Sequence, residues 1–169
     1  MPISLGVVMD PIAQIKPHKD STFAMLLEAQ RRGWDIWYLE QPDLSLTGGE
    51  VRARLRTLQV TDREQDWFQL GAERTAPLAE LDVVLMRKDP PFDVEYVYTT
   101  YLLELAEAAG CLVVNRPSAL RDANEKLYTA WFPDVCPPTL VARRHQAFLD
   151  FLTAEQDIIL KPLGGMGGA

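Results

Sequence analysis

A lysine followed by glycines, in the segment Ile158 to Ala169, carries the clearest chemical signal of the sequence. The segment reads IILKPLGGMGGA, so an apolar stretch leads to Lys161 and then to a glycine-rich run. Glycine adopts positive φ without strain, and such a loop can turn backbone N–H groups toward phosphate oxygens while lysine adds charge. A Walker A motif is excluded, because its lysine follows the glycines. Two interpretations stay open: a flexible glycine-rich tail, or a phosphate-binding loop formed by Gly165, Met166, Gly167 and Gly168.

A second candidate for anion binding is Lys126, in the segment LRDANEKL. Asp122 and Glu125 have the spacing of a capping box, which predicts a short helix from about Glu125. Lys126 then falls in the first helical turn, where a positive charge opposes the helix dipole at a cost of about 0.3 kcal/mol. Capping accounts for the acidic residues but not for the lysine, so Lys126 is a plausible anion ligand.

Two loops with polar residues follow apolar runs that are typical of buried parallel strands. Met9-Asp10-Pro11 follows the first run, and Arg87-Lys88-Asp89-Pro90-Pro91 follows LDVVLM. Ligands of open α/β sheets bind beyond the carboxyl ends of the strands. Asp10, Arg87, Lys88 and Asp89 are therefore candidate ligand-binding residues. The alternative is ordinary loop chemistry, in which proline ends a strand and aspartate caps the next element.

The remaining polar residues carry weaker signals. Arg52, Arg54 and Arg56 alternate with apolar residues and predict a solvated strand face, or a contact with a partner subunit. Acidic residues are scattered without a catalytic dyad. The two cysteines, Cys111 and Cys136, lack the spacing of a metal site or of a disulfide framework, which favours a reducing compartment.

Composition excludes several classes of protein. The chain has 169 residues, 47% of them hydrophobic and 24% charged, as in soluble globular proteins. A net charge of −7 argues against non-specific nucleic-acid binding, which needs a basic surface. The N-terminus lacks the basic region of a signal peptide, and no run approaches the ~20 apolar residues of a membrane span. A cytoplasmic protein with no membrane contact is expected.

The order of the elements predicts an α/β domain over residues 1–120. Strands are expected at 3–9, 34–39, 81–86 and 111–114, with a helix capped by Asp20 or Ser21 and ended by Gly33. Asp93 is expected to cap a second helix. Its apolar face comprises Val94, Tyr98, Tyr101, Leu105 and Ala108. Strand–helix–strand order favours a doubly wound, mostly parallel sheet. Residues 40–80 predict a β excursion, with strands at 51–56 and 67–70.

Residues 121–169 have a different character. Strands are expected at 139–142 and 158–161, with a helix between them that carries Ala147, Phe148, Phe151 and Leu152 on one side. One helix and two strands do not bury enough surface for a domain. The segment is therefore expected to be the truncated beginning of a second domain.

Five segments together resemble the prokaryotic-type glutathione synthetases, a family of the ATP-grasp superfamily. They are LGVVMDPIAQI, DSTFAMLLEAQRRG, LDVVLMRKDPPFD, VVNRPSALRDANEKLYTAWFP and DIILKPLGGMGG, in the family's order and spacing. LMRKDPPFD and LRDANEKL are specific to the family, whereas the glycine loop occurs more widely among ATP-grasp enzymes. The resemblance implies a Rossmann-like pre-ATP-grasp domain at 1–120 and the beginning of an ATP-grasp domain at 121–169.

The resemblance also implies a reaction, in which ATP activates γ-glutamylcysteine as an acyl phosphate and glycine attacks it to form glutathione. It assigns Lys126, Lys161 and the loop Gly165–Gly168 to the nucleotide, and the Asp10 and Arg87–Asp89 loops to the peptide substrate. Mg²⁺ is implied, with its ligands expected beyond residue 169. The family further suggests a homo-oligomer, specifically a tetramer.

Three functions remain to be weighed. The first is the synthetase, for which residues 1–169 alone are expected to be inactive and to contain no confident catalytic residue. The second is a non-catalytic α/β module for oligomerisation or peptide binding. The third is a different ATP-grasp carboxylate–amine ligase, such as a D-alanine–D-alanine or ribosomal-protein glutamate ligase.

Overall fold

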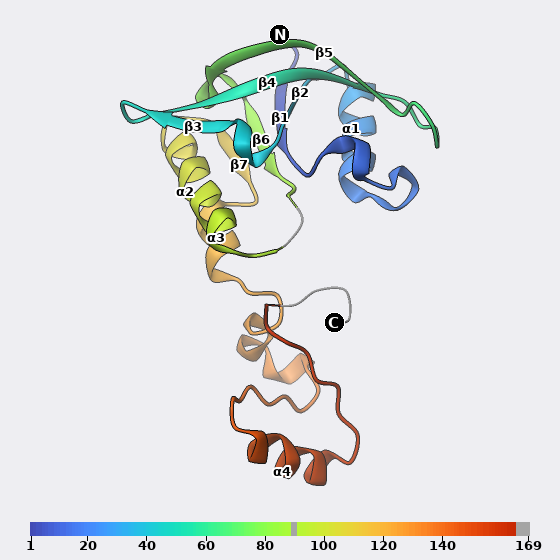
Figure 1. Cartoon of the computed structure of the whole chain (residues 1–169), viewed down its shortest axis with the longest axis vertical. Coiled ribbons are helices and arrows are strands. Elements are labelled where there is room, and N and C mark those ends of the chain that lie inside the picture. The colour runs from blue at the N-terminus through green and yellow to red at the C-terminus, as the bar shows by residue number, and fades with distance from the viewer. Residues whose placement is uncertain (89–90, 165–169) are drawn as a thin grey trace. The chain divides into compact units, whose positions relative to one another are not determined.

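The computed structural model describes residues 1–88 and 91–164, which form two compact units, 1–119 and 120–169. The first unit contains one sheet with the strand order β3-β4-β2-β1-β6-β7, and β5 pairs with the other edge of β4 (Figure 1). Its strands are β1 (Ser4–Val8), β2 (Asp35–Leu39), β3 (Leu44–Thr47), β4 (Glu50–Val60), β5 (Phe68–Pro77), β6 (Val83–Met86) and β7 (Leu112–Val114).

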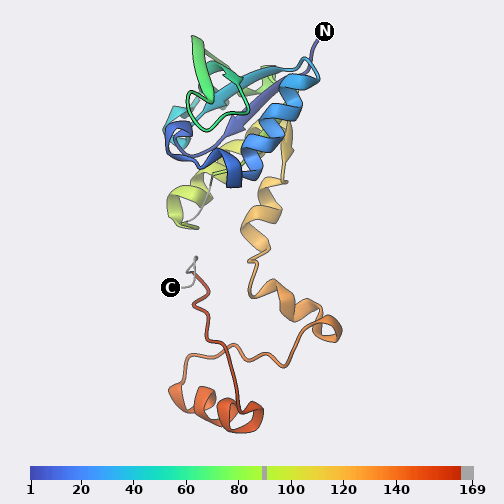
Figure 2. The same ribbon diagram turned by 90° about the vertical axis from the view of Figure 1, so that its right-hand side faces the viewer.

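The sheet combines a parallel half with an antiparallel excursion. β2, β1, β6 and β7 are parallel neighbours, whereas β3, β4 and β5 run antiparallel to their partners. Helices α1 (Ser21–Arg31) and α2 (Val94–Ala108) cover opposite faces of the sheet (Figure 1 and Figure 2). The predicted α/β fold with a β excursion is therefore confirmed, although β4 and β5 are longer than the sequence pattern indicated.

Helix α1 illustrates why the first βαβ unit was predictable. The Asp20 side chain accepts a hydrogen bond from the N–H of Phe23 at 2.8 Å and so caps the helix. Phe23, Leu26 and Ala29 are buried in one core cluster with Leu5 and Val7 of β1 and Ile36 of β2. Gly33 ends the helix with φ +72°, a conformation that costs glycine little.

Helix α2 presents a different face to the core than the one predicted. Asp93 caps it as expected, accepting from the N–H of Tyr96 at 2.8 Å. The buried side chains, however, are Thr99, Thr100, Leu103 and Ala106. The predicted apolar face is largely exposed, with exposed fractions of 60% for Val94, 56% for Tyr98 and 44% for Leu105. The helix therefore has two faces that could pack against a sheet. Thr100 can be buried because its Oγ1 donates to the carbonyl of Val97 at 2.7 Å.

The arginine stripe of β4 is also not simply a solvated face. Val51, Ala53 and Leu55 are buried, as the alternation predicted. The Arg56 side chain is only 19% exposed, and its Nη2 lies 3.0 Å from Oδ2 of the buried Asp43. Its guanidinium also stacks on the ring of Tyr38, 4.7 Å from the centroid. Two of the three arginines, Arg54 and Arg56, therefore pair with the buried Asp43.

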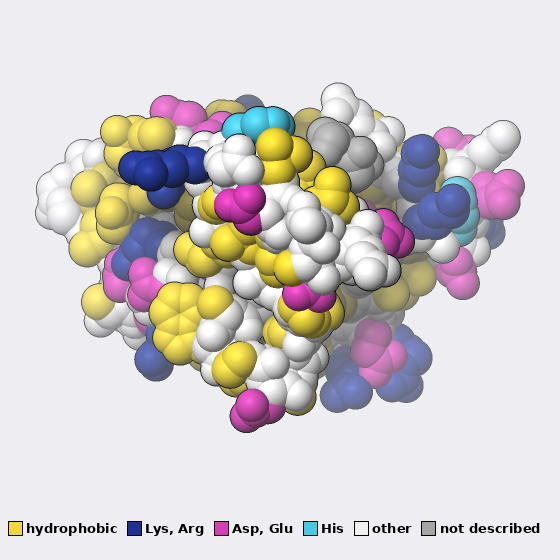
Figure 3. Space-filling view, turned by 90° about the horizontal axis from the view of Figure 1, so that it is seen from below, with side chains coloured by type: hydrophobic (Ala, Val, Ile, Leu, Met, Phe, Trp, Pro, Cys, Tyr) yellow, Lys and Arg dark blue, Asp and Glu magenta, His cyan; other side chains and the backbone are white. Residues whose placement is uncertain are grey.

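The second unit contains helices but, among its described residues, no strand. Helix α3 (Pro117–Asp122) leads into it, and α4 (His145–Glu155) is its longest helix. The strands predicted at 139–142 and 158–161 are absent, because an extended segment becomes a strand only by hydrogen bonding to a neighbouring one. Ile159 is 83% exposed and Leu160 66%. Figure 3 shows hydrophobic side chains exposed on the face of the molecule that is viewed from below.

The predicted capping box at Asp122 is wrong as well. Helix α3 ends at Asp122, and the helix expected from Glu125 is replaced by a short 3-10 turn at Tyr128–Trp131. The Asn124 side chain instead stabilises the turn before it: its Oδ1 accepts from the N–H groups of Lys126 at 3.1 Å and Leu127 at 2.8 Å. Asparagine is common at such turns, because its short side-chain amide reaches the backbone N–H groups two or three residues further along the chain.

Candidate functional site

The two predicted ligand loops of the first unit are brought together at one edge of the sheet. β1 and β6 are parallel neighbours in register, with Val8 opposite Met86, so Asp10 and Arg87 follow the strands at the same edge. The backbone N–H of Arg87 donates to the carbonyl of Val8 at 2.8 Å, and Lys88 Nζ lies 2.8 Å from Asp10 Oδ1. Asp89, the fourth predicted residue, lies outside the described residues.

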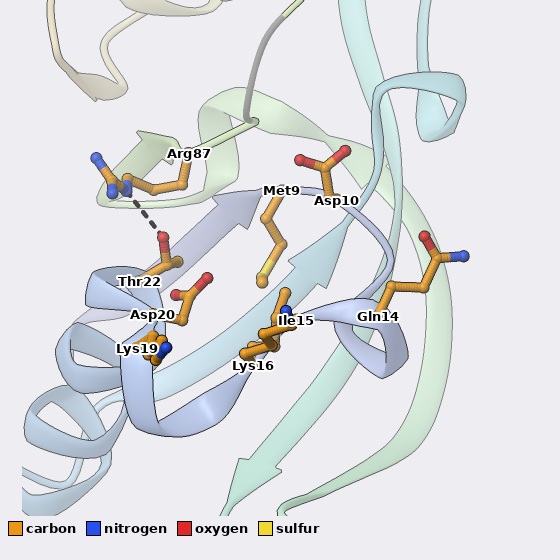
Figure 4. Close-up of a pocket in the computed structure, with 9 residues that line it drawn as sticks. All are labelled: Met9, Asp10, Gln14, Ile15, Lys16, Lys19, Asp20, Thr22 and Arg87. Atoms are coloured by element: carbon orange, nitrogen blue, oxygen red, sulfur yellow. Dashed lines mark hydrogen bonds between the residues drawn. The ribbon is translucent and has the colours of Figure 1, made fainter. Parts of the chain in front are cut away.

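This edge is also the topological switch point of the sheet. The chain passes from β1 to β2 on one side, and later returns to β6 on the other side of β1. The connections therefore diverge above and below the sheet and leave a crevice at the carboxyl ends of β1 and β6. A cavity of about 380 Å³ occupies this place (Figure 4) and is lined by Met9, Asp10, Gln14, Ile15, Lys16, Lys19, Asp20, Thr22 and Arg87.

The Arg87 side chain is fixed by hydroxyl groups in the first turn of α1. Its Nε donates to Thr22 Oγ1 at 3.0 Å, as Figure 4 shows, and its Nη2 donates to Ser21 Oγ at 2.9 Å. Hydroxyl groups orient a guanidinium without neutralising it, and arginine stays charged at all relevant pH values. The arrangement therefore presents an oriented positive charge at the rim of the cavity.

The loop between β1 and α1 is fixed by a buried tyrosine. The Tyr38 hydroxyl accepts from the N–H of Ile12 at 3.2 Å and donates to Glu40 Oε1 at 2.5 Å, while its side chain is 1% exposed. Burial, and then the bond to Glu40, raise the pKa of Tyr38, so the hydroxyl keeps its proton and can serve both partners. The backbone that carries Gln14, Ile15 and Lys16 is thus tied to β2.

Sequence reasoning missed the cavity residues that come from this loop. Gln14, Lys16, Lys19 and Thr22 were not candidates, although the segment QIKPHKDST holds two lysines directly after a predicted strand end. Two 3-10 turns, Ile12–Gln14 and Pro17–Lys19, fold the segment back over the sheet edge. Such short turns leave no periodic pattern, which is why the basic residues were not connected with the strand end.

In the second unit, Lys126 lies against the backbone that leads into the glycine segment. Its Nζ donates to the carbonyls of Pro162 at 2.8 Å and Leu163 at 3.3 Å, and Glu125 Oε1 lies 3.5 Å away. The two sequence-predicted elements of the phosphate site are therefore neighbours, despite a separation of 36 residues. Lys161 is exposed, and Gly165, Met166, Gly167 and Gly168 lie outside the described residues.

Other kinds of site find little support in the part of the chain that is described. No group of three or more His, Cys, Asp or Glu side chains there could hold a metal ion. Burial raises the pKa of the Cys111 thiol to about 11, which disfavours the reactive thiolate. Within residues 1–88 and 91–164, every helix is too short or too polar to cross a bilayer.

Comparison with known proteins gives consistent matches over both units. The family model for the prokaryotic glutathione synthetase N-terminal domain matches residues 3–121, and that for the prokaryotic glutathione synthetase ATP-grasp domain matches residues 125–169.

Individual relatives agree with the family models. Glutathione synthetase of Escherichia coli (strain K12) is 59% identical over 99% of this chain, which spans 53% of that protein. The synthetases of Yersinia pestis and Salmonella typhimurium are each 58% identical, over 98% and 99% of the chain. The chain thus spans about half the length of the curated relatives it matches. Since the N-terminal family model alone covers more than half of the residues, the chain belongs to the prokaryotic glutathione synthetase family.

Proposed function

We propose that the chain forms the N-terminal α/β domain, residues 1–120, and the beginning of the ATP-grasp domain, residues 121–169, of a glutathione synthetase. The enzyme joins γ-glutamylcysteine to glycine at the expense of ATP. The observation that carries this proposal is an identity of 58–59% to proteins of that name over nearly the whole chain. The position of Lys126 at the start of the glycine segment supports it.

In the proposed reaction, the γ-phosphoryl group of ATP passes to the cysteinyl carboxylate, and ADP leaves. The amine of glycine then attacks the carbonyl carbon of the acyl phosphate, so that a C–N bond forms and phosphate departs. Lys126, Lys161 and the Gly165–Gly168 loop would hold the phosphates, because lysine and glycine N–H groups stabilise the charge that moves between oxygens. Asp10, Arg87, Lys88 and Asp89 would serve the peptide substrate.

Magnesium would supply charge neutralisation at the phosphates, as it does in most phosphoryl transfers. Mg²⁺ requires hard oxygen ligands, and no group of three or more His, Cys, Asp or Glu side chains among the described residues could hold a metal ion. The chain's own contribution near the phosphates would come from the Gly165–Gly168 loop and from Lys126 and Lys161, which act as point charges.

A chimeric enzyme tests the proposed function. Residues 1–169 would replace the matching part of the Escherichia coli (strain K12) synthetase, and glutathione and phosphate would be measured with γ-glutamylcysteine, glycine and ATP. We expect glutathione to form only when all three substrates are present, and no ligase activity from residues 1–169 alone.

The same assay separates the competing functions. A folded chimera that makes no glutathione, beside an active parent enzyme, would contradict the proposal and favour a non-catalytic module. Phosphate release with D-alanine or with glutamate as acceptor, in place of glycine, would instead indicate a different carboxylate–amine ligase. Circular dichroism of the chimera shows that any loss of activity is not a loss of folding.

We further propose that the protein is a homo-oligomer. Val94, Tyr98 and Leu105 form an exposed apolar face on α2, and surfaces of this kind are commonly covered in assemblies. Leu105→Glu is therefore expected to reduce the sedimentation coefficient of the chimera, whereas Glu104→Gln on the same helix serves as the control. A strictly monomeric parent chimera would contradict this proposal.

A further inference from the structure

The end of β2 and the turn that follows it are bonded to both of the candidate ligand loops or to the helix next to them. We propose that Tyr38, Glu40 and Gln41 are positioning residues, which hold the loops after β1 and β6 in the arrangement that binds the peptide substrate. This inference rests on the proposed function, in which those two loops serve γ-glutamylcysteine. None of the three residues is among those that line the cavity, so they act on the substrate only through the backbone.

The connection to the loop after β1 is a single buried hydroxyl group. Tyr38 lies near the end of β2 and is 1% exposed, and its hydroxyl accepts from the N–H of Ile12 at 3.2 Å. Ile12 is itself only 2% exposed. Without the hydroxyl, this buried N–H would be left unpaired, which costs more than an ordinary hydrogen bond contributes. The position of the loop therefore depends on where the Tyr38 hydroxyl lies.

Glu40 fixes the Tyr38 hydroxyl from the other side. Its Oε1 accepts from the hydroxyl at 2.5 Å and lies 3.5 Å from Nη2 of Arg56. A hydroxyl that donates its proton to a carboxylate keeps its lone pairs for another donor, here the N–H of Ile12. The backbone of Glu40 is held in turn by the buried Asp43, whose Oδ2 accepts from its N–H at 2.9 Å.

The same turn reaches the helix that follows the second loop. Gln41 Nε2 donates to Thr99 Oγ1 at 2.9 Å, and Thr99 is 5% exposed in α2. The Thr99 hydroxyl donates to the carbonyl of Glu95, in the first turn of that helix, at 3.0 Å. The loop that begins at Arg87 ends where α2 begins, so Gln41 holds the element at its far end. The turn after β2 therefore anchors both loops.

These buried bonds constrain the loops more strongly than the contact that joins the loops directly. Lys88 Nζ lies 2.8 Å from Asp10 Oδ1, but both side chains are partly exposed, and ion pairs of that kind contribute little. Loops that are ordered in advance lose little conformational entropy when a ligand binds. Loosening the anchor should therefore raise KM for the peptide substrate. It should leave kcat nearly unchanged, because the three residues do not touch the reacting atoms in the proposed reaction.

Tyr38→Phe in the chimeric enzyme is the first test, because it removes the hydroxyl and keeps the ring. We expect KM for γ-glutamylcysteine to rise about tenfold, the effect of one buried N–H left unpaired, while kcat and KM for ATP stay near those of the parent. Hydrogen–deuterium exchange of residues 10–16 should become faster even without substrate. A parental KM for γ-glutamylcysteine would overturn the proposal.

Gln30→Met is the matched control for general destabilisation. The Gln30 side-chain amide donates to the carbonyl of Val60 at 2.7 Å and accepts from its N–H at 2.8 Å. Gln30 lies in the last turn of α1, whereas the Arg87 side chain bonds to the first turn. We expect this variant to have a lower melting temperature and an unchanged KM. An equal rise in KM would show that loss of stability alone explains the effect of Tyr38→Phe, and would overturn the proposal.

Variants of Glu40 test whether it acts through Tyr38. Glu40→Gln keeps an oxygen that can accept from the hydroxyl and should retain most of the affinity, whereas Glu40→Ala should raise KM about tenfold. Combining Glu40→Ala with Tyr38→Phe should weaken the substrate no further than Tyr38→Phe alone, because both changes break one chain of bonds. Additive effects of the two changes would contradict that chain.

Gln41→Leu tests the connection to α2. It removes the donor to Thr99 and should raise KM for γ-glutamylcysteine about threefold, as expected for one neutral hydrogen bond. Exchange should become faster at residues 94–97, the first turn of α2, and stay parental at residues 10–16. A parental KM would overturn the role assigned to Gln41.

The inference and the proposed function can fail separately. If the chimera makes glutathione and Tyr38→Phe leaves KM unchanged, the positioning role is wrong and the function stands. If the chimera makes no glutathione, binding of γ-glutamylcysteine is measured by calorimetric titration. Weaker binding by Tyr38→Phe but not by Gln30→Met would then support the positioning role, and the ligase function would be wrong.

Discussion

Replacing Lys126 by methionine is expected to lower kcat/KM for ATP in the chimeric enzyme by roughly 100-fold, the usual cost of losing one charge-stabilising donor. The Lys126 ammonium lies 2.8 Å from the carbonyl of Pro162, at the start of the glycine segment. Methionine keeps the length of the side chain but removes both the charge and the donors. Steady-state kinetics at varied ATP concentrations measure the effect.

Two roles of Lys126 can be separated by further variants. Lys126→Arg keeps the positive charge but not the compact ammonium, so it should recover part of the activity if charge at the phosphates is what matters. A purely structural role, holding the loop through the carbonyls of residues 162 and 163, would show instead as a lower melting temperature with little change in KM for ATP. Arg143→Met, an exposed change in the same unit, is the control. An Lys126→Met chimera with parental kcat/KM would contradict the nucleotide assignment.

Replacing Asp43 by alanine is expected to lower the free energy of unfolding of the first unit by about 3 kcal/mol, as for breaking a buried ion pair. The Asp43 side chain is 3% exposed and accepts from Arg54 at 2.7 Å and Arg56 at 3.0 Å. Its Oδ2 also accepts from the N–H of Glu40 at 2.9 Å. Alanine would leave the 19%-exposed Arg56 without its closest carboxylate, whereas the half-exposed Arg54 would regain water. We therefore expect a loss at the lower end of the range for buried pairs.

Urea denaturation of the parent and the variant measures this loss. Glu73→Ala is the matched control, because Glu73 pairs with the same Arg54 but at 3.8 Å and with both side chains half exposed. Exposed pairs of this kind contribute roughly 0–1 kcal/mol, so the control should unfold almost as the parent does. Equal losses for the two variants would show that burial of Asp43 does not decide its contribution.

The first βαβ unit shows how much of the fold is predictable from local signals. An apolar run, the Asp20 cap, apolar residues at helical spacing and Gly33 follow one another between residues 3 and 33, and each acts on its immediate neighbours. Helix propensity, capping and periodicity all predict the same elements there, and the packing of the folded chain is consistent with them. The predicted strands also located the strand ends, and these place Asp10, Arg87 and Lys88 at one edge of the sheet.

In other parts of the chain, which residues are buried and which form strands depends on partners that are distant in the sequence. α2 has two faces that could be buried, and only its packing against the sheet selects Leu103 and Ala106 over Tyr98 and Leu105. Residues 158–161 have the composition of a strand, but they are not one without a neighbour to bond. Strand pairing and burial depend on the folded chain as a whole, so a local sequence pattern cannot predict them.

By itself, the sequence determined the α/β class, the positions of the loops at the ends of β1 and β6, and the resemblance to one family, because these depend on short segments read in order. Only the tertiary structure decided that Lys16 and Lys19 join Arg87 around one cavity, and that Lys126 reaches the backbone at Pro162. The physical reason is the distance along the chain over which each interaction acts. Caps and periodicity act over three or four residues, whereas a binding site is made by charges that meet in space from separate elements.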